Sequence, residues 1–312
     1  MEIPSSIELE HKLPITDLLH QYMAGESHDH TVFSNPITRE EAFYTFEQVY
    51  EYIKKEINTG ESQIEFVVFT EHPSDAGNPQ LIDGQALLAH QNEIKKFNQA
   101  QESGPQLFGG VESSIISAEG NLDVPNEVLA QMDLVIASKH DLKSAFPEQK
   151  GRITPEQLTH VYSNLMDNPH VDVIGHPNRY VSYDDLKLID WKSLFEKAAL
   201  TNTAIELNLN APMPGWLVKM AVAAGAPLFI GTDAHTLKEY QKLANEEQMA
   251  IEDPDARLEQ PLGVKYSFWK KVVRMLRTLE EAKTPTDQVI TSSVENIKAW
   301  LDCEKVDRVK EY

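Results

Sequence analysis

Seven short segments of this 312-residue chain contain the residue types that bind transition metals. They are His28-Asp29-His30, Thr70-Glu71-His72, Gly110-Val111-Glu112, Ser138-Lys139-His140, Gly175-His176-Pro177, Glu206-Leu207-Asn208 and Thr232-Asp233-Ala234-His235. Imidazole and carboxylate ligands suit Zn, Mn and Fe, and a carboxylate can bridge two ions. If the fold gathers these segments in space, they predict a site for two or three divalent metal ions.

The spacing inside the segments supports the same site. His28 and His30 are two residues apart, so on a strand both side chains point to one face. Asp233 and His235 repeat this spacing late in the chain. A single histidine such as His176 would by itself indicate a hydrogen-bonded structural residue, so the prediction depends on the whole set. The other histidines have no such partners in the sequence and are read as surface or structural residues: His11, His20, His90, His160 and His170.

Apolar runs typical of buried strands precede most of these segments. They cover residues 64–69, 134–137, 171–174, 204–209 and 227–230. Helical patterns alternate with them at residues 38–57, 86–101, 155–166, 190–201 and 214–224. The first helical pattern opens on Thr38 and Glu41 in the spacing of a capping box. Repeated βα units predict an α/β fold with a parallel sheet, and their number favours a barrel, whose active site lies at the carboxyl ends of the strands.

The start of the chain fits this pattern least well. Residues 22–27, which precede His28, lack the apolar character of a core strand. The segment 1–21 instead predicts a helix, with Ile15, Leu18, Leu19 and Tyr22 on one face. We expect an N-terminal extension at residues 1–23 and a single barrel domain at residues 24–312, because no linker and no internal repeat divides the chain.

Composition narrows the class of partner. The chain carries 28 basic and 49 acidic residues, a net charge of −21. Neutralising DNA phosphates takes clustered Lys and Arg, so a nucleic-acid partner is disfavoured and a small phosphorylated substrate is easier to accommodate. The single cysteine, Cys303, fits a reducing compartment. With neither a secretory leader nor about 18 consecutive apolar residues, the chain is expected to be cytoplasmic and to have no membrane partner.

Several longer stretches resemble one known superfamily. They are residues 110–125 (GVESSIISAEGNLDVP), 133–140 (DLVIASKH), 168–177 (NPHVDVIGHP), 231–235 (GTDAH) and the closing stretch 293–301 (SVENIKAWL). Over about residues 24–301 the chain resembles the PHP superfamily, named for polymerase and histidinol phosphatase. It is most similar to the PHP domain of bacterial family X DNA polymerases and to stand-alone relatives of that domain. The resemblance implies a distorted seven-stranded (β/α) barrel, similar to a TIM barrel.

The resemblance also implies a role for each predicted ligand. His28, His30, Glu112 and Asp233 would hold a first ion, Glu112 would bridge it to a second ion on His140 and His176, and His72 and His235 would bind a third. The superfamily usually supplies a further Asp or His to the third ion shortly after the second His. Here Asn35 and Pro36 stand at those positions. Because Asn is an uncharged and poor ligand, the third site is expected to be weak, empty or completed by water.

Several residues next to the predicted ligands could have supporting roles. Lys139 and Arg179 either hold a substrate phosphate or are solvated surface charges; in related phosphotyrosine phosphatases an Arg follows the corresponding His-Pro pair. Glu71 and Asn208, like Asn35, are expected to hydrogen-bond to ligands and orient them. Glu206 is read as structural, one step off the alternation that faces the metals.

Three functions are compatible with this site. The favoured one is a metal-dependent hydrolase, a phosphoesterase that cleaves a small phosphomonoester with a metal-bridged water and no protein nucleophile. The second is a phosphodiesterase, a nuclease or DNA-end-processing enzyme, which a basic stripe leading to the site would favour. The third is an inactive metal-binding regulatory protein. Asn35 hints at the third, and eight good ligands argue against it.

Overall fold

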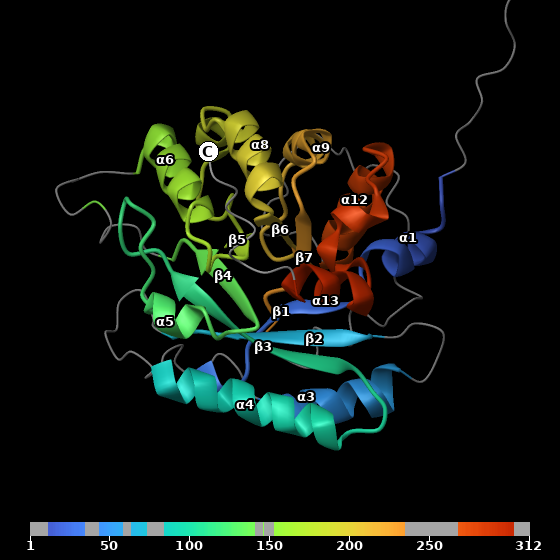
Figure 1. Cartoon of the computed structure of the whole chain (residues 1–312). Coiled ribbons are helices and arrows are strands. Elements are labelled where there is room, and N and C mark those ends of the chain that lie inside the picture. The colour runs from blue at the N-terminus through green and yellow to red at the C-terminus, as the bar shows by residue number, and fades with distance from the viewer. Residues whose placement is uncertain are drawn as a thin grey trace, which may run out of the picture.

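A computed structural model describes residues 12–34, 44–58, 64–73, 84–140, 146, 153–234 and 268–302. Seven parallel strands form one sheet in which each strand pairs with the next in chain order (Figure 1). The strands are β1 (Gly25–Asp29), β2 (Phe66–Glu71), β3 (Gln106–Ser114), β4 (Leu134–Ser138), β5 (Val173–Gly175), β6 (Ala204–Asn208) and β7 (Leu228–Gly231). A parallel bridge between Asp29 and Ala234 joins the carboxyl end of β1 to the segment that follows β7. The predicted distorted seven-stranded (β/α) barrel is confirmed.

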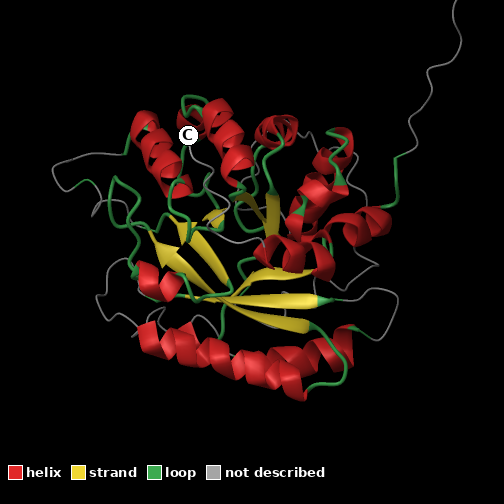
Figure 2. Cartoon of the chain, viewed as in Figure 1, coloured by secondary structure: helices red, strands yellow, loops and turns green. Residues whose placement is uncertain are grey.

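Helices surround this sheet (Figure 2). They are α1 (Ile15–Tyr22), α3 (Phe46–Tyr52), α4 (Gly84–Ala100), α5 (Asn126–Leu129), α6 (Pro155–Met166), α7 (Tyr183–Leu186), α8 (Trp191–Thr201), α9 (Gly215–Ala224), α12 (Phe268–Glu281) and α13 (Val294–Asp302). Short helical turns lie at η1 (Val32–Ser34), η2 (Ile53–Ile57), η3 (Thr286–Gln288) and η4 (Ile290–Ser292). Helices α3 and α4 run along β2 and β3 on one side, and α6, α8 and α9 lie on the other side (Figure 1). Of the helices in the described ranges, none has both the length and the hydropathy that crossing a bilayer requires.

Local sequence explains where two of these helices begin. Thr154 and Gln157 form a capping box at the start of α6, in which each side chain accepts a hydrogen bond from the other residue's backbone N–H. Thr45 and Gln48 form the same motif at the start of α3. The predicted start of that helix at Thr38 lies outside the described residues, but Thr45 is extended (φ −79°, ψ 163°), so the predicted helix is not continuous through this position.

The interior of the barrel changes from apolar to polar along the strands. Inward-facing residues such as Phe66 and Val68 fill its amino-terminal end, and α13 closes this end with Trp300, whose ring centroid lies 6.4 Å from that of Phe229. The buried residues of this cluster are Ala24, Phe66, Val68, Phe108, Leu134, Ile136, Val173, Ala204, Phe229, Ile290, Ile297 and Trp300. The same strand faces carry polar residues, including Glu112, at the carboxyl end, since side chains two residues apart share a face. The barrel therefore has an apolar base and a polar mouth.

Strand β1 is polar and yet completely buried. Glu26 accepts hydrogen bonds at Oε1 from the backbone N–H groups of Ser27, His28 and Thr232, at 2.9–3.0 Å. The Ser27 hydroxyl donates to the carbonyl of Ile230 on β7. Burial still dominates at Glu26 and raises the pKa of its carboxyl to about 7. The strand that the apolar pattern failed to indicate is thus held by side-chain hydrogen bonds across the barrel seam.

Helix α1 packs against α12 and the barrel core. Leu18, Leu19 and Tyr22 are buried in the cluster that also contains residues of β3 to β7. The Tyr22 hydroxyl donates to the carbonyl of Thr284 at 3.0 Å, and the Arg277 guanidinium donates to the carbonyl of Leu13 at 2.6 Å. The predicted N-terminal helix is confirmed at residues 15–22, whereas a domain limit at residue 23 stays a prediction.

Candidate metal centre

The carboxyl ends of the strands bring most of the predicted ligands together around Glu112. Five of the neighbours are imidazoles, His28, His30, His72, His140 and His176, and the sixth is Asp233. His235, Asn35 and Pro36 lie outside the described residues. The structure thus gathers seven of the eight predicted ligands, and it does so deep inside the barrel mouth.

Side-chain atoms of His28, His30 and Glu112 lie close enough together to share one metal ion, and Asp233 lies beside the two imidazoles. His28 Nε2 lies 3.4 Å from Glu112 Oε2 and 3.9 Å from Asp233 Oδ1, while His30 Nε2 lies 3.6 Å and 3.4 Å from the same two oxygens. Ligands at 2.0–2.1 Å from a tetrahedral ion are separated by about 3.3 Å. His28 Nε2 and Glu112 Oε2 are buried and make no hydrogen bond, although they face each other. These residues fit a divalent ion.

The second oxygen of Glu112 faces a different pair of rings. Glu112 Oε1 lies 3.1 Å from His140 Nε2 and 2.8 Å from His176 Nε2. Ser114 Oγ lies 2.9 Å from His140 Nδ1 and fixes that ring from behind. Because its two oxygens face different sets of ligands, Glu112 is placed as a carboxylate that bridges two ions would be.

His72 occupies a third position beside the same carboxylate. Its Nδ1 lies 3.2 Å from Glu112 Oε2, and its ring stacks on that of His30 with centroids 4.2 Å apart. His72, Glu112 and His140 also form a group that could hold a metal ion by themselves. The described His and Glu clusters therefore suit divalent metal binding at more than one position.

Glu206 holds two of the proposed ligands, which corrects its reading as an off-axis structural residue. Its Oε1 accepts a hydrogen bond from His28 Nδ1 at 2.7 Å, and its Oε2 accepts one from the backbone N–H of His176. Asn208, two residues along β6, donates from Nδ2 to Glu206 Oε1 at 3.0 Å. Residues 206 and 208 share a strand face, so Glu206 faces the centre and could have been found from this spacing.

Gly231 makes room for this arrangement. A Cβ atom at this position would lie 2.7 Å from the Cβ of His28 and 2.9 Å from Glu206 Oε1. Either contact is too short for a side chain, so β7 can approach the His28–Glu206 pair only with glycine here. The close approach of β7 also brings Asp233 to the ligand group.

Within the described residues, the hydrogen bonds of the Glu71 side chain go to residues other than the predicted metal ligands. Glu71 hydrogen-bonds to the Thr31 hydroxyl at 2.6 Å, to the Ser34 hydroxyl, and to His90 Nε2 at 3.3 Å. Ser34 Oγ in turn accepts from the backbone N–H of His72 at 3.0 Å. Glu71 thus fixes the turn after β1 and is connected to the backbone of His72 through Ser34. His90, which the sequence left without a partner, is part of this buried network.

Electrostatics in the centre favour ionised carboxylates. Burial would raise the pKa of Glu112, but the imidazoles of His140 and His28 prevail and hold it well below its ordinary value. Burial would lower the pKa of His28, but the carboxylates of Glu206 and Glu112 raise it well above 6.5. The pKa of His140 is also raised, by Glu112 against the effect of burial. Burial and the neighbouring His30 hold the pKa of His72 well below 6.5.

Two of the predicted ligands have an unusual backbone conformation. His176 has a φ of 24° and Asp233 a φ of 58°, both in the left-handed region that non-glycine residues seldom adopt. The Asn210 side chain holds the second of these turns by donating to the carbonyls of Thr232 and Asp233 at 2.7 and 3.2 Å. Such strain is found at functional sites, where the surrounding structure determines the conformation.

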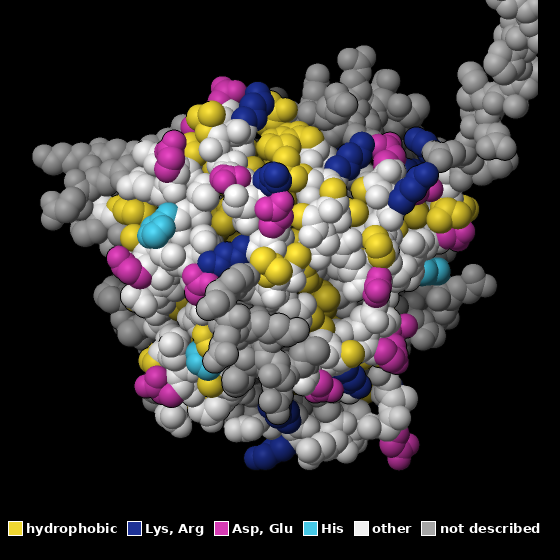
Figure 3. Space-filling model, turned by 45° about the horizontal axis from the view of Figure 1, so that its top comes forward, with side chains coloured by type: hydrophobic (Ala, Val, Ile, Leu, Met, Phe, Trp, Pro, Cys, Tyr) yellow, Lys and Arg dark blue, Asp and Glu magenta, His cyan; other side chains and the backbone are white. Residues whose placement is uncertain are grey.

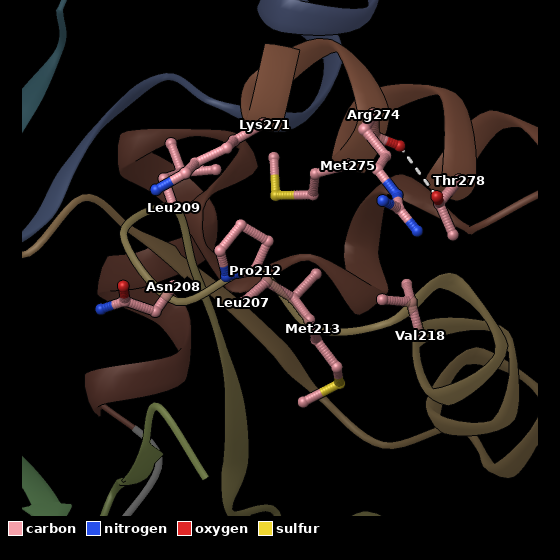
Figure 4. A pocket seen from close by; sticks show the side chains of 10 residues that line it. All are labelled: Leu207, Asn208, Leu209, Pro212, Met213, Val218, Lys271, Arg274, Met275 and Thr278. Carbon is pink, nitrogen blue, oxygen red and sulfur yellow. Dashed lines mark hydrogen bonds between the residues drawn. The ribbon is translucent and has the colours of Figure 1, made fainter. Parts of the chain in front are cut away.

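A pocket is lined by residues of β6, α9, α12 and the loop after β6 (Figure 4). Its lining includes Leu207, Met213 and Met275, and Lys271 at its edge donates to the carbonyl of Asn210 at 3.2 Å. Because Asn210 also holds the Asp233 turn, this contact connects α12 to the metal centre. We assign the pocket a packing role.

The two predicted phosphate-binding residues differ in position. Arg179 NH1 lies 2.7 Å from Asp233 Oδ2, so its guanidinium reaches the edge of the ligand group. Lys139 is only 8% exposed, which rules out the solvated surface charge. A role for either residue at a phosphate stays a prediction.

Comparisons with known proteins agree with the resemblance and the fold. No family model matches the chain. It is 32% identical over 182 residues to the DNA polymerase/3'-5' exonuclease PolX of Bacillus subtilis, a match that covers 56% of this chain but 30% of that protein. It is 24% identical over 294 residues to a probable phosphatase of Caldanaerobacter subterraneus, a match that covers 91% of this chain and 92% of that protein.

A solved structure shares the fold. Histidinol phosphate phosphatase from Lactococcus lactis, solved in complex with zinc, L-histidinol and phosphate, superposes with a TM-score of 0.54 at 14% identity and covers 85% of this chain and 95% of its own. That enzyme and the N-terminal domain of PolX are both PHP proteins. The predicted resemblance to the PHP superfamily is therefore confirmed, while activity and substrate are matters of proposal.

Proposed function

We propose that this chain is a metal-dependent phosphoesterase that hydrolyses a small phosphomonoester. The observation that carries the proposal is the position of Glu112, whose two oxygens face separate sets of imidazoles inside the barrel mouth. Two-ion sites of this kind suit phosphoryl transfer, in which negative charge must be neutralised on several oxygens at once. The similarity to a probable phosphatase over 91% of the chain supports the same class.

We assign the ligands to the ions as the resemblance to the PHP superfamily implies. The first ion would be held by His28, His30, Glu112 and Asp233, and the second by Glu112, His140 and His176. His72, with His235 from outside the described residues, would bind a third. Zn, Mn or Fe, when bound here, would acidify a water molecule and withdraw charge from the phosphoryl oxygens.

The protein side chains then have positioning tasks. Glu206 fixes the His28 ring with Nε2 toward Glu112, and when a metal is bound it would keep the proton of the imidazole on Nδ1, where the carboxylate accepts it. Arg179, 2.7 Å from Asp233, is placed to donate to a phosphate bound at this edge of the centre. Lys139, adjacent to His140, would add positive charge near the second ion.

A screen of phosphorylated metabolites with Mn-loaded protein tests this function. We expect hydrolysis of at least one small phosphomonoester, with activity removed by chelation and restored by Mn. Elemental analysis of protein prepared without chelator should find two to three divalent ions per chain. A count near zero, with no uptake of added Mn or Zn, would overturn the assignment. A cytoplasmic location, predicted from the single Cys303, belongs to the same proposal.

A phosphodiester substrate is the second candidate, because PolX, with its 3'-5' exonuclease, matches over 182 residues. In Figure 3 acidic and basic side chains are interspersed on the face shown, and the Lys and Arg side chains drawn there form no continuous stripe. A nuclease assay beside the phosphatase screen separates the two. Inactivity in both, with metal bound, would favour a regulatory metal-binding protein.

A further inference from the structure

The loop after β5 presents an aromatic ring beside the metal centre. Tyr180 is 70% exposed, the highest exposure among the large apolar and aromatic side chains that the structure leaves open in its described ranges. Its neighbour Arg179 is 33% exposed and lies 2.7 Å from the ligand Asp233. The guanidinium group of Arg179 therefore lies between the Tyr180 ring and the predicted ligand Asp233.

Arg179 and Tyr180 are also in contact with each other. The guanidinium carbon of Arg179 lies 5.1 Å from the centroid of the Tyr180 ring, the geometry of a cation–π pair. This contact orients the ring next to the position where Arg179 would hold a phosphate. With 70% of the residue exposed, ring surface remains open to a further partner.

The backbone holds Tyr180 in this position at a cost. Its φ is 60°, in the left-handed region that bulky side chains rarely adopt. The surrounding loop is anchored: the Tyr162 hydroxyl donates to the carbonyl of Pro177 at 2.8 Å, and Asn178 Nδ2 donates to the carbonyl of Ala211 at 2.9 Å. A strained, exposed aromatic residue on an anchored loop at a site edge is the pattern of a residue that contacts ligand.

We propose that Tyr180 is a stacking surface for the leaving group of the substrate, and that the site prefers aryl or heteroaryl phosphomonoesters. The inference rests on the proposed phosphoesterase function and adds the chemical class of the substrate. A phosphate engaged by Arg179 would direct its ester substituent outward, past the ring of Tyr180. An aromatic substituent can stack there, whereas a short alkyl substituent makes little contact.

Binding of two non-hydrolysable probes to the metal-loaded full chain tests the proposal. Calorimetry should show that Tyr180→Ala weakens phenylphosphonate binding about three- to tenfold, the contribution of one aromatic pair, while methylphosphonate binding stays within about twofold. Tyr180→Phe should bind both probes as the wild type does. Tyr180→Gly should lose the same preference as Tyr180→Ala although glycine suits the left-handed backbone, which separates the ring from the loop conformation.

Leu188→Ala is a matched control, because Leu188 is 66% exposed and, among the interactions of the described residues, makes no contact with Arg179. It should change neither probe. The proposal is overturned if Tyr180→Ala weakens both phosphonates equally or neither of them.

Kinetics distinguish this result from failure of the proposed function. The ratio of kcat/KM for phenyl phosphate to kcat/KM for methyl phosphate measures the preference for an aryl substituent. If wild type and Tyr180→Ala both hydrolyse these esters with the same ratio, the phosphoesterase function holds and the stacking proposal is wrong. If phenylphosphonate binding depends on Tyr180 but no phosphomonoester is hydrolysed, the stacking surface holds and the phosphoesterase function is wrong. A wild-type protein that binds neither phosphonate would overturn both.

Discussion

Glu206 uses both of its carboxylate oxygens at the metal centre, accepting from His28 Nδ1 at 2.7 Å and from the backbone N–H of His176. Asn208 donates a third hydrogen bond to it at 3.0 Å. A glutamine here would keep the shape, but its NH2 group would face another donor whichever way the amide turned. Its neutral side chain would also leave the His28 imidazole less basic, and therefore a weaker ligand.

We therefore expect Glu206→Gln to lower zinc affinity about 10- to 100-fold without unfolding the protein. Zinc titration against a competing chelator measures this, with far-UV circular dichroism to verify the fold. Glu196→Gln is the matched control, because Glu196 is an exposed residue of α8 that lies 3.9 Å from Lys192. Unchanged affinity in the Glu206 variant would contradict the orienting role.

Glu112 should be the least replaceable ligand, since both of its oxygens face imidazoles. Glu112→Gln removes the charge that allows two cations to lie close together. We expect bound metal to fall to about one ion per chain or fewer and phosphomonoester turnover to fall at least about 100-fold, while the fold persists. Elemental analysis and a Mn-dependent phosphatase assay measure the two effects. Near-wild-type turnover would show that Glu112 does not bridge.

At the scale of elements, the strands and helices differ in how well the sequence predicts them. Apolar runs indicated β2, β4, β5, β6 and β7, because a buried parallel strand is apolar on both faces. β1 escaped this pattern, since its buried polar groups are satisfied by Glu26 and by the carbonyl of Ile230, and such long-range partners cannot be read from local sequence. The partner of His90 could not be predicted for the same reason: Glu71 lies on a different element, and His90 is structural, one of the two roles expected for it.

Helix α1 was predicted as an extension, but its apolar face belongs to the main core. Leu18 is fully buried among residues of the barrel and α12. Leu18→Ala should lower the free energy of unfolding by about 2–5 kcal/mol, the cost of removing a buried leucine side chain. Leu13→Ala, at a 42% exposed position beside the same helix, should change it by less than about 0.5 kcal/mol. Urea denaturation of both variants measures the difference, and equal, small effects would show that α1 is dispensable.

At the scale of the whole molecule, stability should depend jointly on pH and metal. The pKa values of His28 and His140 are raised in the metal-free protein. Their protonated forms stabilise the fold at low pH, and this contribution is lost as the pH rises through the raised pKa values. Metal binding requires neutral imidazoles, so it strengthens over the same range, from near 6.5 upward.

The difference in Tm between zinc-loaded and chelated protein should therefore grow between pH 6 and pH 8.5. Thermal unfolding followed at several pH values, with zinc and with EDTA, measures it. The carboxylates of Glu112 and Asp233 do not obscure the trend, because neighbouring imidazoles hold their pKa values far below this range. A difference that is flat or that shrinks with pH would contradict the linkage.

For the molecule as a whole, the net charge of −21 favours a small phosphomonoester over a polynucleotide as the substrate. A protein binds polynucleotides by displacing counterions with clustered Lys and Arg, and 28 basic residues among 49 acidic ones leave little for this. A small phosphomonoester needs only the bound ions and one or two nearby cations such as Arg179. Negative charge elsewhere on the surface should therefore have little effect on the binding of such a small substrate.

We expect labelled single- and double-stranded oligonucleotides to bind more weakly than about 10⁻⁴ M at physiological salt, outside the usual range of non-specific DNA binding. Hydrolysis of an aryl phosphate with Mn should be measurable under the same conditions, and Arg179→Ala should reduce it without removing metal. Fluorescence anisotropy and a phosphatase assay on one preparation provide both readings. Strong DNA degradation beside inert phosphomonoesters would reverse the assignment, because the metal centre would then act on a substrate that the surface charge repels.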